Sequence, residues 1–137
     1  MTTIEKPLPD VTNPLTAAYW SAAREHRLVV PRCTNCGYTF WPPEVVCPEC
    51  QHTDFAWDEV AQSGTLWSYA TYYRALDAAF ADELPYTVGL IDLGKGIKMY
   101  GIMRTPPQDV VIGQRVEAVF EDVTPEVTMV RWAAATE

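Results

Sequence analysis

The sequence predicts a mainly β protein with one helix near the N-terminus, a small metal-bound module and a compact C-terminal barrel. Two observations lead to this fold class. Four cysteines lie between Cys33 and Cys50, and the chain from Phe55 onward alternates β-branched and aromatic residues with turn signals at regular intervals. The 137 residues suffice for one ordinary domain, or for a small module beside a barrel, but not for two independent cores.

The composition indicates a folded chain with a narrow choice of partners. Apolar residues make up 48% of the sequence, which is typical of globular proteins. A net charge of −8 weighs against a nucleic-acid partner, because such binding depends on clustered lysine and arginine. No signal peptide and no segment long enough to cross a bilayer is evident. We therefore expect a cytoplasmic protein with no membrane association, in which clustered cysteines bind metal instead of forming disulfides.

The N-terminal segment, residues 1–30, is predicted to hold an arm and a helix. Residues 1–11 contain little apolar surface and are expected to form a mobile or draped arm. Asn13 and Pro14 predict the helix start, because asparagine caps free amides and proline fits the first turn. An apolar stripe with helical spacing then predicts three or four turns, followed by three basic residues in the last turn. The stripe is Leu15, Ala18, Tyr19, Ala22 and Ala23, and the basic residues are Arg24, His26 and Arg27.

Residues 31–53 are predicted to form the metal-bound module. Two Cys-x-x-Cys pairs, Cys33 with Cys36 and Cys47 with Cys50, are separated by ten residues. Four thiolates complete the tetrahedral shell of a zinc ion, and such a closed site has no open position for a substrate. We therefore expect a structural zinc ion that stabilises a segment too small for its own core. Iron is the alternative metal, although a glycine usually follows the second pair and Gln51 stands there instead.

Residues 54–137 are predicted to form the barrel. A glycine-rich turn over residues 92–96 indicates a hairpin, and a second turn spans residues 111–114. Gly89 and Gly101 lie inside predicted strands, where glycine often marks a bulge, a sharp bend or the close approach of another backbone. The insertion Ala75–Leu84 is expected to be a short helix or a long loop. The predicted strands are Phe55–Val60, Thr65–Tyr73, Tyr86–Leu93, Ile97–Met103, Arg115–Glu121 and Val127–Trp132.

Catalytic motifs are missing from the sequence. Each of the four cysteines is assigned to the metal, so no thiol is left as the nucleophile that a thiolase needs. The serines lie in no nucleophile-elbow context, and no phosphate-binding glycine loop or dinucleotide fingerprint is present. We therefore predict no catalytic residue and do not expect the chain to act as an enzyme on its own.

The order of these motifs resembles one protein family over nearly the whole chain, from about Pro14 to Trp132. This family joins a rubredoxin-like zinc ribbon to an OB-fold and was formerly of unknown function. The resemblance implies a ribbon over residues 31–53 and an OB-fold barrel over residues 54–137. The motifs that carry it are the Trp-Pro-Pro of 41–43, Ser-Gly-Thr-Leu at 63–66, Leu-Pro-Tyr-Thr-Val-Gly-Leu-Ile at 84–91, Gly-Ile-Lys-Met-Tyr-Gly-Ile-Met at 96–103 and Ile-Gly-Gln-Arg-Val at 112–116.

The resemblance also implies a non-catalytic accessory or scaffold subunit. Members of the family accompany thiolases, thiolase-like acyltransferases and the thiolase-like retro-aldolases of steroid side-chain degradation. This chain is similar to the stand-alone form, in which the OB-fold docks on a thiolase-like catalytic subunit and helps shape the acyl-CoA passage. We therefore expect a hetero-oligomer, a thiolase or aldolase complex, that acts in lipid or steroid degradation.

The aromatic residues suggest where the partner docks. Tyrosine and tryptophan are favoured at interfaces, and a small barrel needs only some of these rings inside. The insertion Arg74–Leu84 is expected at the partner surface or acyl-CoA channel, because long connections on rigid scaffolds carry function. The expected interface residues are Tyr72, Tyr73, Arg74, Phe80 and Tyr86, from a wider aromatic set that includes Trp41, Trp67 and Tyr69.

Two other functions remain open from the sequence. A single-stranded nucleic-acid binder would use the barrel aromatics as a stacking platform. A self-contained hydrolase or thioesterase would need an acid-base pair, drawn from carboxylates such as Asp77, Asp82, Glu83 and Asp92.

Overall fold

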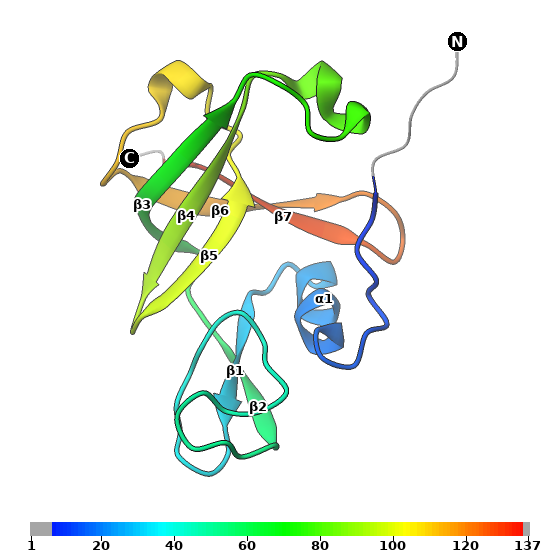
Figure 1. Ribbon diagram of the computed structural model, residues 1–137, viewed down its shortest axis with the longest axis vertical. Helices are drawn as coiled ribbons and strands as arrows, with labels where there is room; N and C mark the ends of the chain where they lie inside the picture. Colours follow the sequence, from blue (N-terminus) through cyan, green and yellow to red (C-terminus); the bar gives the residue numbers. More distant parts are fainter. Residues whose placement is uncertain (1–6, 136–137) are drawn as a thin grey trace.

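The computed structural model describes residues 7–135 and confirms the mainly β fold (Figure 1). A two-stranded ribbon and helix α1 lie at one end, and a curled five-stranded sheet lies at the other (Figure 1). All six predicted strands form, with ends that differ by no more than two residues. The elements are α1 (Ala17–Arg24), β1 (Val29–Cys33), β2 (Phe55–Glu59), β3 (Ser63–Tyr72), η1 (Ala78–Glu83), β4 (Tyr86–Gly94), β5 (Ile97–Ile102), η2 (Pro107–Asp109), β6 (Arg115–Asp122) and β7 (Thr128–Ala134).

Helix α1 is shorter than predicted, and its predicted start was wrong. The Asn13 side chain accepts a hydrogen bond from the Leu15 amide at 3.0 Å, so Asn13 caps a turn in front of the helix. The helix itself begins at Ala17 and has eight residues instead of three or four turns. Part of the predicted arm, residues 1–6, lies outside the described residues.

The end of α1 also differs from the expectation. His26 has a φ of 58°, and the Arg27 amide donates to the Ala22 carbonyl at 2.9 Å. This hydrogen bond and a left-handed residue just after the helix are typical of a Schellman cap. The helix therefore ends at Arg24, and His26 and Arg27 lie beyond its last turn.

The larger sheet curls until its two edge strands meet. Its strand order is β5-β4-β3-β6-β7, and every neighbouring pair is antiparallel. A parallel bridge between Met103, just after β5, and Trp132 on β7 joins the two edges. Register shifts at Leu66/Ser68 and Asp92/Gly94 mark irregularities that accompany the strong bending of strands in a barrel.

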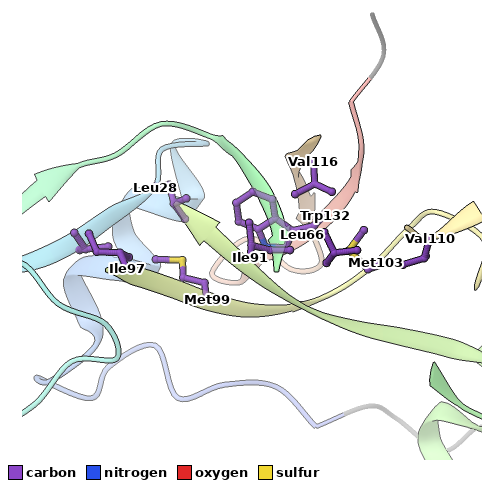
Figure 2. Close-up of a cluster of buried hydrophobic side chains, with 10 residues drawn as sticks. Leu28, Leu66, Ile91, Ile97, Met99, Met103, Val110, Val116 and Trp132 are labelled. Carbon is purple, nitrogen blue, oxygen red and sulfur yellow. The ribbon is translucent and has the colours of Figure 1, made fainter. Parts of the chain in front are cut away.

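One hydrophobic core joins the barrel to the ribbon (Figure 2). Trp132 is 1% exposed and fills the centre of the barrel interior. Leu28, just before β1, and Val30, on β1, are fully buried in the same cluster. The remaining members are Leu66, Ile91, Ile97, Met99, Met103, Val110 and Val116.

The two strand glycines are required by close contacts in this core. A Cβ atom on Gly89 would lie 2.9 Å from both Leu66 Cδ1 and Met103 Sδ. A Cβ on Gly101 would collide with the indole ring of Trp132. The predicted close approach therefore involves side chains of the core rather than a neighbouring backbone.

The insertion between β3 and β4 contains the short 3-10 helix η1, so the helical alternative holds. The Asp77 side chain caps η1 by accepting from the Ala79 amide at 2.9 Å. No helix among residues 7–135 combines the length and apolar character needed to cross a membrane.

Candidate metal centre and docking surface

The four cysteines meet at the tip of the ribbon in the arrangement expected for a metal centre. All four Sγ atoms lie within 4.8 Å of one another, with 3.5 Å between Cys33 and Cys50 and 3.7 Å between Cys36 and Cys47. A zinc ion with Zn–S bonds of about 2.3 Å holds tetrahedral sulfurs about 3.8 Å apart. The two measured pairs therefore lie close to the spacing of a tetrahedral zinc site, and the other sulfurs lie within about 1 Å of it.

Each Cys-x-x-Cys pair folds into the same turn, and the two turns repeat each other. The amide that follows each pair donates to the carbonyl of its first cysteine: Gly37 to Cys33 at 3.0 Å, and Gln51 to Cys47 at 2.9 Å. Both residues take left-handed backbone angles, with φ of 79° at Gly37 and 66° at Gln51. Gln51 thus adopts the conformation that glycine takes in the first turn.

Hydrogen bonds and crowding shape the electrostatics of the sulfur atoms. The Asn35 side chain donates to Cys50 Sγ at 3.5 Å; together with the His52 backbone amide it lowers the pKa of the Cys50 thiol to about 6. At Cys36 the Tyr38 amide favours the thiolate, but desolvation and the three other cysteines raise the pKa to about 12. Four crowded thiolates need a nearby cation, and a divalent metal ion supplies it.

The zinc prediction is therefore confirmed at the level of the donor set. Cys33 and Cys47 are buried, whereas Cys36 and Cys50 are exposed, so the site lies at the edge of the ribbon. Bound zinc supplies folding free energy. Because four sulfur ligands fill its tetrahedral shell, the ion has no open coordination position for a substrate. The His52 backbone carbonyl accepts a hydrogen bond from the Cys47 amide at 2.8 Å.

We predict that Gln51→Gly stabilises the zinc ribbon. A left-handed backbone costs a non-glycine residue about 1 kcal/mol, and glycine avoids this cost. The substitution is expected to raise the midpoint of thermal unfolding of the zinc-loaded protein by a few degrees. Gly37→Gln is the matched control and is expected to lower the midpoint, since it introduces the same strain into the other turn. Equal midpoints for both variants would contradict this account of the turns.

Three of the five predicted interface residues form one aromatic cluster beside η1. The rings of Tyr72 and Tyr86 stack with centroids 5.2 Å apart, and the Phe80 ring lies 6.1 Å from that of Tyr86. The other two residues follow β3 directly: Tyr73 is 77% exposed, and Arg74 is also exposed. The structure therefore places Phe80 within the insertion, in η1, and the other four residues around the start and end of the insertion.

The wider aromatic set divides between core and surface. Trp41 packs against the core cluster, and its ring lies 4.8 Å from that of Tyr19. Trp67 and Tyr69 are 56% and 39% exposed. Surface tyrosine and tryptophan therefore gather on β3 and near its end.

The sequence reasoning missed one part of this surface. Tyr100 is 76% exposed on β5, and Val88 and Leu90 lie half-buried on β4. The signal was present in the 84–91 motif, where Tyr86, Val88 and Leu90 alternate with Thr87, Gly89 and Ile91, so neither set carries a charge. A strand with one solvent-facing side would alternate apolar with polar residues.

Within residues 7–135, His26 and Asp122 form an acid-base pair that differs from the carboxylates considered above. His26 Nε2 lies 3.1 Å from Asp122 Oδ1, and Thr128 donates to the same oxygen at 2.7 Å. The His26 ring also stacks on Phe120, with centroids 5.0 Å apart. These contacts connect the end of α1 to β6 and β7, which gives the pair a structural role.

Comparison with known proteins identifies both parts of the chain. Residues 20–56 match the family model of the ChsH2 rubredoxin-like zinc ribbon domain, and residues 57–121 match that of the ChsH2 C-terminal OB-fold domain. A DUF35 domain-containing scaffold protein of Methanocaldococcus jannaschii is 33% identical over 107 residues, covering 76% of this chain and 75% of the relative.

Two further relatives come from larger assemblies or longer chains. A chain of the solved Ltp2-ChsH2(DUF35) aldolase superposes with a TM-score of 0.82 and 29% identity, covering 93% of this chain and 100% of that one. A probable enoyl-CoA hydratase alpha subunit of Thermomonospora curvata is 32% identical over 114 residues; the match covers 82% of this chain but only 35% of that longer protein. The chain therefore belongs to the DUF35 family, whose members join a ChsH2-type zinc ribbon to a ChsH2-type OB-fold.

Proposed function

We propose that this protein is a non-catalytic accessory subunit of a thiolase-like enzyme. The observation that carries the proposal is its likeness, over 93% of its length, to a chain of the Ltp2-ChsH2(DUF35) aldolase. The name of the Methanocaldococcus jannaschii relative, a scaffold protein, agrees with such a role. The closed four-sulfur site supports it as well, because a zinc ion with four protein ligands offers no position for a substrate.

We further propose that the catalytic subunit docks at the aromatic cluster of Tyr72, Phe80 and Tyr86, together with Tyr73 and Arg74. Exposed aromatic and arginine side chains supply most of the binding energy at many protein interfaces. Tyr73 and the nearby Leu76 are 77% and 82% exposed, so both side chains are accessible to a partner. The insertion that contains η1 would then border the acyl-CoA passage of the catalytic subunit.

The proposal predicts co-purification with a thiolase-like polypeptide. The tagged chain, expressed in its native cell, is expected to retain such a polypeptide, identified by mass spectrometry, and the complex is expected to turn over an acyl-CoA. Replacing Tyr73 and Arg74 together by alanine should reduce the retained amount about tenfold or more, since hot-spot truncations cost at least about 2 kcal/mol. Val45→Ala, on the exposed surface of the ribbon, is the matched control and should retain the partner.

Other results would reject this function. Salt-sensitive retention of single-stranded oligonucleotides, without a thiolase-like polypeptide, would favour the nucleic-acid alternative. Hydrolysis of an acyl-CoA thioester by the purified chain alone would show that it is a self-contained enzyme.

A further inference from the structure

The outer face of β3, β4 and β5 is unusually apolar for a surface of a small barrel. Strand β4 carries Thr87, Gly89 and Ile91 on its inner face, where all three are buried. Its outer face carries Tyr86, Val88 and Leu90, followed near the hairpin by Asp92, the one charged residue of the strand. Large apolar residues on the face of a strand that points away from the core are typical of a strand that is covered on both sides.

The neighbouring strands extend this apolar face. The β-ladders place Ser68, Leu90 and Tyr100 in one row across the sheet, and Ala70, Val88 and Ile102 in the next. Together with Trp67, Tyr69 and Tyr72, residues of these rows line a groove of about 330 Å³. Tyr100 and Trp67, on the two strands that flank β4, are 76% and 56% exposed. We call this groove the outer-sheet groove.

A positive charge stands at one end of the outer-sheet groove. Lys98 Nζ lies 4.9 Å from the centroid of the Trp67 ring, in a cation-π contact. Asp92 lies opposite Lys98 in the ladder, but Asp92 Oδ1 accepts from the Gly94 amide, and among residues 7–135 Lys98 forms no ion pair. Arg27, Arg32, Arg104 and Arg131 each bind a carboxylate, whereas among residues 7–135 Lys95 and Arg115, like Lys98, form no ion pair. In a chain with a net charge of −8, an unpaired lysine beside exposed rings favours an acidic partner group.

The groove also continues into the surface already proposed for docking. Tyr72 pairs with Tyr86 at the end of the ladder opposite Lys98, and both rings belong to the aromatic cluster beside η1. A single partner could thus cover the cluster and the groove without a gap.

We propose that the outer-sheet groove is a second part of the docking surface: it receives an apolar side chain of the catalytic subunit, with a carboxylate of that subunit beside Lys98. The identity of this partner rests on the proposed function; the chemistry of the contact rests on the groove itself. Burial of an apolar anchor in a ring of aromatic side chains is how many interfaces concentrate their binding energy.

Site-specific photo-crosslinking in the native cell tests the groove directly. A benzophenone amino acid replaces Tyr100, whose exposure allows the substitution, and a second variant carries it at Val45 on the ribbon, which is 72% exposed. We expect position 100 to crosslink to the thiolase-like subunit at a peptide that contains an aspartate or glutamate, and more strongly than position 45.

Binding measurements with the co-purified subunit supply the second readout. Tyr100→Asp is expected to weaken affinity about 30-fold, because it places a charge against the apolar anchor. Lys98→Glu is expected to slow association and to reverse its dependence on salt, whereas Lys95→Glu, in the adjoining turn, should have a smaller effect. Circular dichroism of each variant checks that the fold is unchanged.

The outcomes separate this inference from the proposed function. If the thiolase-like subunit co-purifies but position 100 gives no crosslink, or crosslinks only to a second copy of this chain, the groove is not a docking site for that subunit. The proposed function would not be contradicted by either result. A crosslink from position 100 to an acidic peptide of another class of protein would retain the groove and overturn the function. Neither crosslink nor co-purification would overturn both.

Discussion

Cys47→Ser is expected to release the zinc ion and to unfold the ribbon. Cys47 is completely buried, and its sulfur is one of four ligands. Structural zinc contributes about 10 to 16 kcal/mol to folding in small zinc modules. This contribution is as large as, or larger than, the total stability of a typical domain, which is about 5 to 15 kcal/mol. Atomic absorption should show zinc falling from one ion per chain to none, with the loss of a cooperative thermal transition.

His52→Ala provides the control for Cys47→Ser. His52 follows the last ligand, but four sulfur atoms already fill a tetrahedral site. The variant is therefore expected to keep a full equivalent of zinc and a midpoint of unfolding close to that of the original protein. Retention of zinc by Cys47→Ser, or loss of zinc from His52→Ala, would show that the ligand set differs from the four cysteines.

Trp132→Ala is expected to cost about 3 to 5 kcal/mol, the range for removal of a large buried ring. Trp132 is 1% exposed, and its backbone forms the bridge that joins the edges of the curled sheet. Such a loss is a large fraction of the stability of a small domain, so the variant should unfold at a much lower urea concentration than the original protein. Urea titration followed by circular dichroism measures the change in the free energy of unfolding.

Gly101→Ala tests the same contact from the opposite side. The added methyl group would meet the Trp132 ring, and such overpacking costs about 1 to 3 kcal/mol. In a double-mutant cycle with Trp132→Phe, the smaller ring should leave room for the methyl group, so the combined loss should be less than the sum of the two. Strict additivity would show that Gly101 is needed for a reason other than the ring. Gly113→Ala, in an open turn, tests backbone strain alone.

The sequence predicts the barrel well because its signals are local. Alternation of residues fixes which side of a strand is buried, and the Gly94–Gly96 turn fixes the hairpin between β4 and β5. The cysteine spacing predicts the zinc site for a similar reason, since two knuckles need only face each other. The predicted start of α1 was wrong because an asparagine such as Asn13 can cap either a helix or an isolated turn. Tertiary contacts decide which of the two forms.

The proposed docking surface was only partly predictable. The aromatic residues around the insertion stand close together in sequence, so their cluster could be expected. The outer-sheet groove combines Trp67, Leu90 and Tyr100 from three strands, and their proximity follows from the register of the ladders. Gln51 illustrates the same limit: its left-handed angle comes from the repeated turn and not from any preference of glutamine.

The burial of Leu28 and Val30 in the barrel core has a consequence for anyone who cuts or grafts this protein. A fragment that starts at the first barrel strand would lack two side chains that plug its interior, and the empty space would cost stability that no compensating contact restores. A ribbon grafted onto another protein would likewise expose Leu28 and Val30 to solvent. Chimeras with relatives should therefore exchange the stretch from Leu28 to Glu59 only together with the barrel residues it touches, as one inseparable piece of architecture.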